Sequence, residues 1–378
     1  MLAIMNIGKY SSSGVTPSGT DLFTISASTS LGQAIDFYAK KGNIILGLPY
    51  MQNTIYRSAD GGATWTSISS PYYLAHIFYS SIEDKFYALE MGDKDTETLH
   101  YGYSTDGSTW TWDTIYEEST EKIHIYGTFI EEANGTVAFD VLKIDSTNVV
   151  GFSYPAIASH LRVFINGTES VIGSTKEVKM NVSGSTAITD MYPALTYRQG
   201  KTKSAMIIED WNATGYQYYG VEPITVGSWG VESEAPYLNQ GYANGQKCLD
   251  NFYSSDQQYS GSSPRTYFVR IWYSPTGRTN TWTYDLSNPI QDSSKVAEKM
   301  YGFFQLGNYY YGAYKVNGSG GITKWYRAGN IDALVKVSMD DTFYKNDLTS
   351  EPVSELSLDS KHFLLSMSDG KIHLCEAT

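Results

Sequence analysis

The most informative segment of the sequence is Ser58-Ala59-Asp60-Gly61-Gly62-Ala63-Thr64-Trp65. The segments on either side of it, residues 54–57 and 66–68, are rich in β-branched and aromatic residues, which is typical of strands. The two glycines take positive φ angles at little cost, and the Asp60 carboxylate can accept backbone N–H bonds inside a turn. The stretch therefore predicts a tight hairpin, with Trp65 returning to pack under the turn.

A second, shorter copy of this hairpin follows at Ser104-Thr105-Asp106-Gly107-Ser108-Thr109-Trp110. Asp60 and Asp106 lie 46 positions apart, close to the roughly 40–50 residues of known four-stranded propeller repeats. Each copy joins the third and fourth of four predicted strands, in a first unit that ends near residue 69 and a second unit that begins near residue 75. The shared order of parts indicates a structural repeat.

The pattern Ser-x-Asp-x-Gly-x-Thr-Trp resembles the Asp box, or BNR repeat, of β-propellers, a group that includes sialidases. The resemblance covers residues 54–113 and implies a ring of four-stranded blades in which the box fixes a hairpin. The implied structural residues are Ser58, Asp60, Gly62, Thr64 and Trp65 in the first box and Ser104, Asp106, Gly107, Thr109 and Trp110 in the second.

Hairpin patterns continue along the rest of the chain. We expect a single all-β domain over residues 1–378, a β-propeller of about six or seven four-stranded blades, with the N- and C-terminal strands closing one blade. Residues 155–260 are less regular and can contain inserted loops. Further expectations are a pairing of residues 194–197 with 204–208, a decayed box at 274–282, and one or two helical turns at 294–300 and at 330–335.

The composition excludes several classes of protein. The net charge of −13 argues against a nucleic-acid-binding surface, because phosphates repel acidic proteins. No apolar run is long enough to span a membrane, and no secretion signal is visible. Cys248 and Cys375 are in no metal or redox spacing, so we expect free thiols, although a disulfide between them stays open.

The resemblance to sialidases implies an arginine cluster for a substrate carboxylate, a tyrosine nucleophile paired with glutamate, and an aspartate acid/base. This chain has seven scattered arginines and no Arg-Ile-Pro motif opens its first blade; the arginines are Arg57, Arg162, Arg198, Arg265, Arg270, Arg278 and Arg327. The acidic runs at 93–97 and 340–341 are typical of loops, and the histidines show no metal-ligand spacing. We therefore expect no catalytic residue, no metal and no cofactor.

Tyrosine is unusually frequent, at 32 residues, while only 18% of residues are charged, against roughly 25% in typical domains. Tyrosine suits contact surfaces, because it offers a broad ring and a hydroxyl at little entropic cost. Two clusters are candidates for ligand or partner contact, although packing between blades is the alternative for both: Tyr216, Tyr218 and Tyr219, and Tyr309, Tyr310 and Tyr311.

This composition resembles that of bacteriophage virion proteins. We expect a non-catalytic structural protein of the phage tail, at the nozzle, the tail tip or the fibres, located in the virion after assembly in the host cytoplasm. Its expected partners are other virion proteins in a multi-copy assembly and a host-surface glycan, without specific nucleic-acid binding. The alternatives are a sialidase-like glycoside hydrolase and a carbohydrate-binding adhesin.

Overall fold

A computed structural model gives the fold of the chain. It describes residues 22–91, 98–117, 123–131, 137–145, 154–165, 169–171, 176–180, 206–212, 215–221, 230–232, 252–260, 266–274, 283–284, 296–317, 323–329, 348 and 350–378. These residues form 25 strands in antiparallel sheets, joined by turns, and no helix occurs among them. The all-β prediction is confirmed. Within the same residues, no helix has the length and hydropathy of a membrane span.

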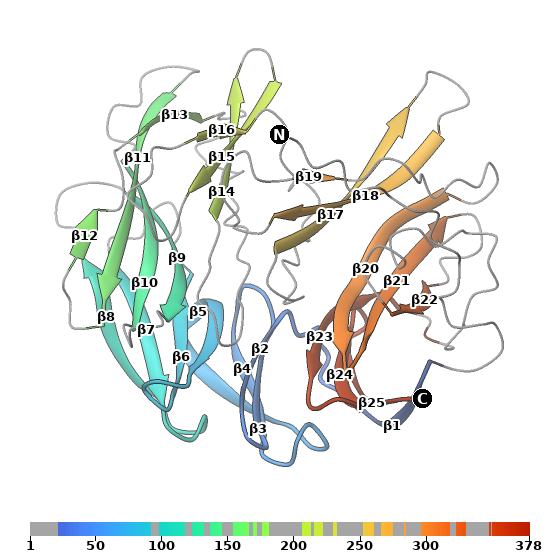
Figure 1. Ribbon diagram of the computed structural model, residues 1–378. Coiled ribbons are helices and arrows are strands. Elements are labelled where there is room, and N and C mark those ends of the chain that lie inside the picture. The colour runs from blue at the N-terminus through green and yellow to red at the C-terminus, as the bar shows by residue number, and fades with distance from the viewer. Residues whose placement is uncertain are drawn as a thin grey trace.

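Strands from the two ends of the chain meet in one four-stranded sheet (Figure 1). Its spatial order is β1 (Phe23–Ser30), β25 (Lys371–Ala377), β24 (His362–Met367) and β23 (Pro352–Ser357). The register of β1 against β25 runs from Phe23 opposite Ala377 to Ser30 opposite Lys371, with one irregularity between them. The predicted joining of the two ends is confirmed, and β25 has a partner strand on both sides, so it offers no open edge.

The largest sheet contains both repeats that the sequence predicts. Its seven strands, in spatial order, are β2 (Phe37–Lys41), β3 (Ile44–Leu48), β4 (Gln52–Ser58), β5 (Thr66–Ser80), β6 (Lys85–Glu90), β7 (Thr98–Ser104) and β8 (Thr111–Glu117). The order of strands in this sheet is the order in the chain, because each strand is joined to the next by a hairpin turn.

Strand β5 belongs to two four-stranded units, β2–β5 and β5–β8. Its first residues pair with β4 and its last residues with β6, and Leu74 has a partner in each, Gln52 and Glu90. We expected separate strands with a break between residues 69 and 75, and that boundary is wrong. The segment around Pro71 stays in the strand because it lies at a register shift against β4, where a missing N–H donor is tolerated.

The other strands form four further sheets. A five-stranded sheet consists of β9 (Ile123–Glu131), β10 (Val137–Asp145), β11 (Tyr154–Phe164), β12 (Glu169–Val171) and β13 (Lys176–Met180). Two three-stranded sheets consist of β14 (Met206–Asn212), β15 (Gly215–Val221) and β16 (Gly230–Glu232), and of β17 (Phe252–Ser260), β18 (Thr266–Ser274) and β19 (Thr283–Tyr284). The last consists of β20 (Val296–Leu306), β21 (Tyr309–Asn317) and β22 (Thr323–Ala328).

The expected pairing of residues 194–197 with 204–208 involves residues outside the described part of the chain; residues 206–208 belong to β14, which pairs with β15. One local prediction outside the repeats is wrong. Residues 296–300 begin β20, although we expected helical turns there. The pairing of β20 with β21 explains the difference, because ladder bonds to a neighbouring strand override a weak local preference. The expected turns at 330–335 and most of the decayed box at 274–282 also lie outside the described residues.

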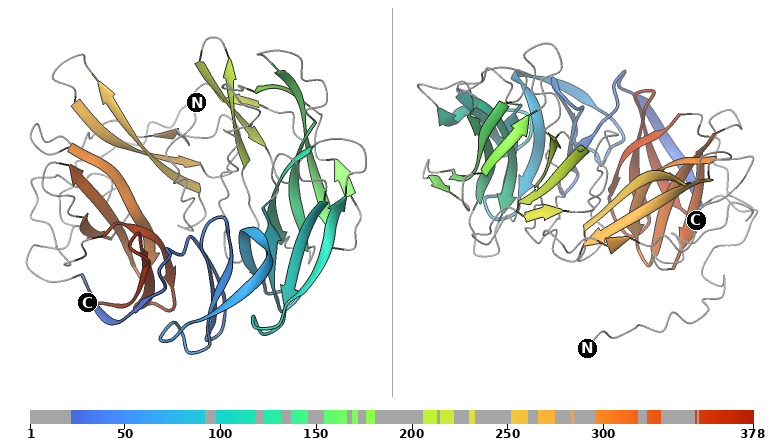
Figure 2. Two further views of the ribbon diagram at one scale, coloured as in Figure 1. Left: turned by 180° about the vertical axis from the view of Figure 1, so that it is seen from behind. Right: turned by 90° about the horizontal axis from the view of Figure 1, so that it is seen from above.

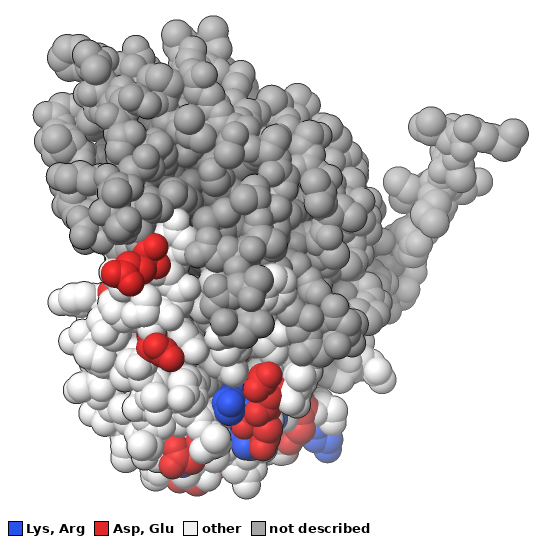
Figure 3. Space-filling model, turned by 90° about the vertical axis from the view of Figure 1, so that its left-hand side faces the viewer, with Lys and Arg blue, Asp and Glu red and all other residues white. Residues whose placement is uncertain are grey.

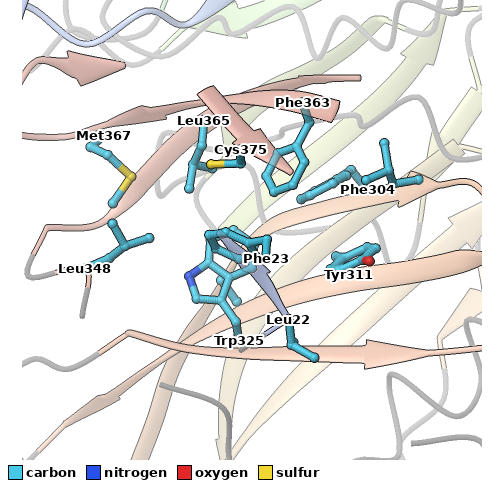
Figure 4. Close-up of a cluster of buried hydrophobic side chains, with 12 residues drawn as sticks. Leu22, Phe23, Phe304, Tyr311, Trp325, Leu348, Phe363, Leu365, Met367 and Cys375 are labelled. Carbon is cyan, nitrogen blue, oxygen red and sulfur yellow. The ribbon is translucent and has the colours of Figure 1, made fainter. Parts of the chain in front are cut away.

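The sheets follow one another around a common centre in chain order, from the sheet β1–β25–β24–β23, which we call the closing sheet, through β2–β8 and back to it (Figure 1). Figure 2 shows the same order from behind and the depth of the sheets from above. The buried apolar clusters lie between adjacent sheets or units as well as within them. One cluster joins β20–β22 to the closing sheet and contains Trp325, Phe304 and Phe363 (Figure 4). In it, the rings of Phe23 and Trp325 meet edge to face, with centroids 5.4 Å apart.

Candidate functional site

The first Ser-Asp turn, residues 58–65, is held by its own side chains. Ser58 Oγ donates to Asp60 Oδ1 at 2.8 Å and accepts from the Gly62 N–H at 2.8 Å. Thr64 donates its hydroxyl to Asp60 Oδ2 at 2.6 Å and its N–H to Oδ1 at 2.9 Å. These bonds, with the Thr64 hydroxyl first, lower the pKa of Asp60 to about 2. Trp65 Nε1 donates to the Gly62 carbonyl at 2.9 Å, so the ring packs under the turn as predicted.

The second Ser-Asp turn, residues 104–110, reproduces this arrangement with one residue fewer. Asp106 Oδ1 accepts from the N–H groups of Ser108 and Thr109, at 2.8 and 3.0 Å, and the Ser108 hydroxyl takes the place of Thr64. Trp110 Nε1 donates to the Gly107 carbonyl at 3.3 Å. The Ser108 hydroxyl and the two N–H groups hold the pKa of Asp106 well below its usual range. Both carboxylates are therefore ionised and engaged inside their turns.

Each turn also docks on the preceding four-stranded unit. A Cβ on Gly107 would lie 2.8 Å from Cδ2 of Leu46 in β3, and a Cβ on Gly62 would lie 2.6 Å from Cδ2 of Leu364 in β24. Strands β3 and β24 occupy the same place in their units, second in the order β2–β5 and second in the order β23–β24–β25–β1. The two contacts are therefore equivalent, and in each the leucine side chain would have to shift to make room for a Cβ on the glycine.

Polar contacts support the docking of the second turn. Lys41 Nζ forms an ion pair with Asp84 Oδ1 at 2.8 Å and donates to the Thr105 carbonyl at 3.4 Å. Arg57 Nε donates to the Asp106 carbonyl at 3.0 Å. Both basic residues belong to the unit β2–β5 and all three acceptor groups to the unit β5–β8, so these bonds join neighbouring units. Figure 3 shows that the described surface on one side is largely uncharged, with basic side chains beside acidic ones.

The structure describes the side chains of one of the two tyrosine clusters. Tyr309 is exposed, and the Arg327 guanidinium lies 4.6 Å from its ring centroid. Tyr310 and Tyr311 are buried, and the Tyr311 ring stacks on Phe304 at 5.2 Å. Burial leaves Tyr309 as the member of this trio that can offer its ring to a partner, and the other two pack in the core. Tyr216, Tyr218 and Tyr219 are on β15, but their side chains lie outside the description.

The end of the units opposite the Ser-Asp turns exposes apolar side chains that the sequence did not single out. Tyr50 and Met51 form the turn between β3 and β4, and Tyr73 lies in β5 beside Leu74, which pairs with Gln52. Their exposed fractions are 44%, 40% and 62%. We call Tyr50, Met51 and Tyr73 the apolar rim. The Pro49-Tyr50-Met51 and Pro71-Tyr72-Tyr73 runs were the signals available in the sequence.

Asp36 lies beside this rim, at the start of β2. Its N–H donates to the Leu48 carbonyl at 3.0 Å, and its Oδ2 accepts the Tyr50 N–H at 2.7 Å. Burial raises the pKa of Asp36, and the Tyr50 N–H opposes that shift. The Phe37 ring lies 6.5 Å from the Tyr50 ring, between ring centroids.

On the second unit, an aromatic stack borders the rim. The Tyr72 and His100 rings are parallel, with centroids 4.2 Å apart, and His100 Nδ1 lies 2.7 Å from Glu90 Oε2. Glu90 also accepts the His100 N–H at 2.9 Å. These contacts fix the segment of β5 that carries Tyr73, since Tyr73 follows Tyr72 directly.

No metal or arginine cluster stands out in the part of the chain that the structure describes. No group of three His, Cys, Asp or Glu residues in it is placed to hold a metal ion. The acidic runs at 93–97 and 340–341 lie outside the described residues. Two arginine side chains are described: Arg57, which joins two units, and Arg327, which donates to the Thr378 carbonyl at 2.6 Å. Cys375 is a free, buried thiol, and Cys248 lies outside the description.

Comparison with known proteins finds solved structures of similar fold. No family model and no curated protein matches the chain. The chain is similar to the structure "YCF48 bound to D1 peptide", with a TM-score of 0.52 and 13% identity over 98% of this chain and 99% of that chain. The fold is a β-propeller. Likeness at this level of identity shows the fold alone.

Two further structures have lower scores. YCF48 from Cyanidioschyzon merolae has a TM-score of 0.43 and 12% identity, over 93% of this chain and 98% of that chain. The WD40 β-propeller domain of Doa1 has a TM-score of 0.44 and 9% identity, over 94% of this chain and 97% of that chain.

Proposed function

We propose that the chain is a non-catalytic β-propeller that acts through contacts with other proteins. The observation that carries this proposal is the apolar rim, where Tyr50, Met51 and Tyr73 are exposed together at one end of the first two units. Exposed aromatic rings with a nearby polar group are typical of protein contact sites. YCF48, in the structure to which the chain is similar, is bound to a D1 peptide, which supports a propeller that uses its surface for peptide contact.

We infer that the ring has seven blades of the Asp-box type. Six sheets are described, and the seven-stranded one contains two four-stranded units that share β5. The hydrogen bonds of the two Ser-Asp turns support their assignment as Asp boxes, because serine, aspartate and tryptophan hold each turn in the same way. A low-resolution projection by electron microscopy that shows six or eight lobes would contradict the blade count.

We further propose that the chain is a structural subunit of a bacteriophage tail, at the nozzle, the tip or the fibres, present in several copies. The support is compositional: few charged residues, abundant tyrosine and a net charge of −13. Mass spectrometry of purified particles, with labelled peptides as standards, tests this proposal. We expect the chain in intact particles at a fixed ratio to the other tail proteins. Its absence from particles, while it is abundant in the lysate, would refute the virion role.

A sialidase-like hydrolase and a carbohydrate-binding adhesin are the alternatives. Turnover of a fluorogenic sialoside, lost in Arg270→Ala, would favour the hydrolase. Binding to a glycan array, lost in Tyr309→Ala, would favour the adhesin, because Tyr309 is the exposed member of its trio. We expect neither activity from a contact protein.

A further inference from the structure

The Asp36 carboxylate is a half-buried anion for which the described residues supply no cation. None of the ion pairs formed by these residues includes it, and its Oδ2 accepts one neutral N–H bond, from Tyr50. Other exposed or half-buried acids do have cationic partners, such as Asp84 with Lys41 and Asp369 with Lys371. A carboxylate taken partly out of water gains more from a cation than a fully solvated one does.

Aromatic rings lie close to the turn whose backbone bonds this carboxylate. The Phe37 ring lies 6.5 Å from the ring of Tyr50 and 5.1 Å from that of His76, between ring centroids. The backbone N–H of Tyr50 bonds Asp36, so the chain segment that carries the Tyr50 ring is fixed relative to the carboxylate. The face of an aromatic ring attracts a cation, and the attraction is stronger where water is partly excluded.

We propose that Asp36 and the Tyr50 ring together bind a lysine or arginine side chain of the protein partner at the apolar rim, an inference that rests on the proposed contact function. The carboxylate supplies the charge, and the ring, with Met51 beside it, covers the apolar stem of the cationic side chain. The acidic chain, with a net charge of −13, attracts a basic segment over a longer range. A partner strand or loop with one basic residue among apolar ones fits this chemistry.

A direct test uses the full chain and two capped synthetic peptides. One contains a single arginine between glycines, and the other has citrulline, which has nearly the same shape without the charge. The methyl resonance of Met51, assigned with Met51→Leu, reports binding at physiological ionic strength. We expect saturable shifts with the arginine peptide and about tenfold weaker binding of the citrulline peptide.

Four variants separate this site from general attraction to an acidic protein. Asp36→Asn keeps an oxygen that can accept the Tyr50 N–H, so the turn is preserved, and it should weaken arginine binding about tenfold. Glu117→Gln makes the same charge change at an exposed position of β8 and should leave the affinity unchanged. Tyr50→Leu should weaken binding, while Tyr50→Phe, which keeps the ring face, should retain it.

Several results would overturn the proposal. They are equal binding of both peptides, full affinity in Asp36→Asn, and no binding of either peptide to the wild-type chain. A different result would refute the proposed contact function itself: proteins from purified particles that do not bind the wild-type chain. If those proteins bind wild type and Asp36→Asn equally, the contact function holds and the cation site is refuted.

Discussion

Gly107 lies against Leu46 so closely that a Cβ on the glycine would be 2.8 Å from Leu46 Cδ2. The residues belong to neighbouring four-stranded units, and Gly62 and Leu364 repeat the relationship one unit earlier. Each Ser-Asp turn is therefore more than a hairpin within its own blade. It is a docking point that sets the distance between one unit and the next, and the hydrogen bonds of its serine and aspartate hold it in shape for that contact.

Replacing Gly107 with alanine should destabilise the protein by about 2–4 kcal/mol. The cost combines the positive φ of +72° with the overlap on Leu46. Gly61→Ala is the matched control, because Gly61 has a φ of +74° but nothing within 4 Å of its added Cβ. It should cost about 1 kcal/mol from the backbone alone. Denaturant unfolding measures both values, and equal costs would show that Leu46 does not resist the added methyl group.

The Asp60 carboxylate should make stability depend on pH in the acid range. Its pKa is lowered from 3.8 to about 2 in the folded chain. The folded state therefore binds the proton less readily than the unfolded state. The stabilisation is complete above pH 3.8 and is lost as the pH falls through 2. Carboxyl NMR titration should give a midpoint near 2 for Asp60 and a higher one in Thr64→Val, which lacks the hydroxyl donor. Equal midpoints in the two proteins would contradict this account.

The two neighbouring positions Tyr309 and Tyr311 should respond very differently to alanine. Tyr311 is buried and stacks on Phe304, so Tyr311→Ala should lower the free energy of unfolding by about 3–5 kcal/mol. Tyr309 is exposed, with Arg327 over its ring, so Tyr309→Ala should cost less than about 1 kcal/mol. Thermal and urea unfolding compare the two. A larger loss in Tyr309→Ala would show that the residue alternation along β21 is assigned to the wrong faces.

The Cys375 thiol should be unreactive while the chain is folded. Burial raises its pKa to about 12, so the reactive thiolate is scarce and reagents have no access. In a Cys248→Ser chain, dithiobis-nitrobenzoate at pH 8 should release no colour from native protein and one equivalent after denaturation. Rapid reaction of the native variant would mean that the closing sheet opens easily or that Cys375 is exposed.

The sequence was most informative where the fold depends on local turns. Asp60-Gly61-Gly62 and Asp106-Gly107 predicted both hairpins and their tryptophans, because the turn chemistry lies within eight residues. The unit boundary at Pro71 was not predictable, since a proline is as compatible with a register shift inside a strand as with a break.

The sequence did not predict the contacts between neighbouring units. Nothing near Gly107 indicates that Leu46 occupies the space above it, because the contact depends on how two units stand side by side. Asp36 and Tyr50 were missed for a related reason. Neither stands out in the sequence, and only the bond between the Tyr50 N–H and Asp36 Oδ2 places a half-buried carboxylate beside the exposed residue Tyr50.

The most direct test of the account is a double-mutant cycle between Gly107 and Leu46, measured as the free energy of unfolding. Truncation in Leu46→Ala removes the methyl groups that a Cβ at position 107 would meet. We predict that Gly107→Ala costs at least about 1 kcal/mol less in that background than in wild type, while Leu364→Ala, its equivalent in another unit, leaves the cost unchanged. An unchanged cost in the Leu46→Ala background would contradict the docking of each turn on the preceding unit.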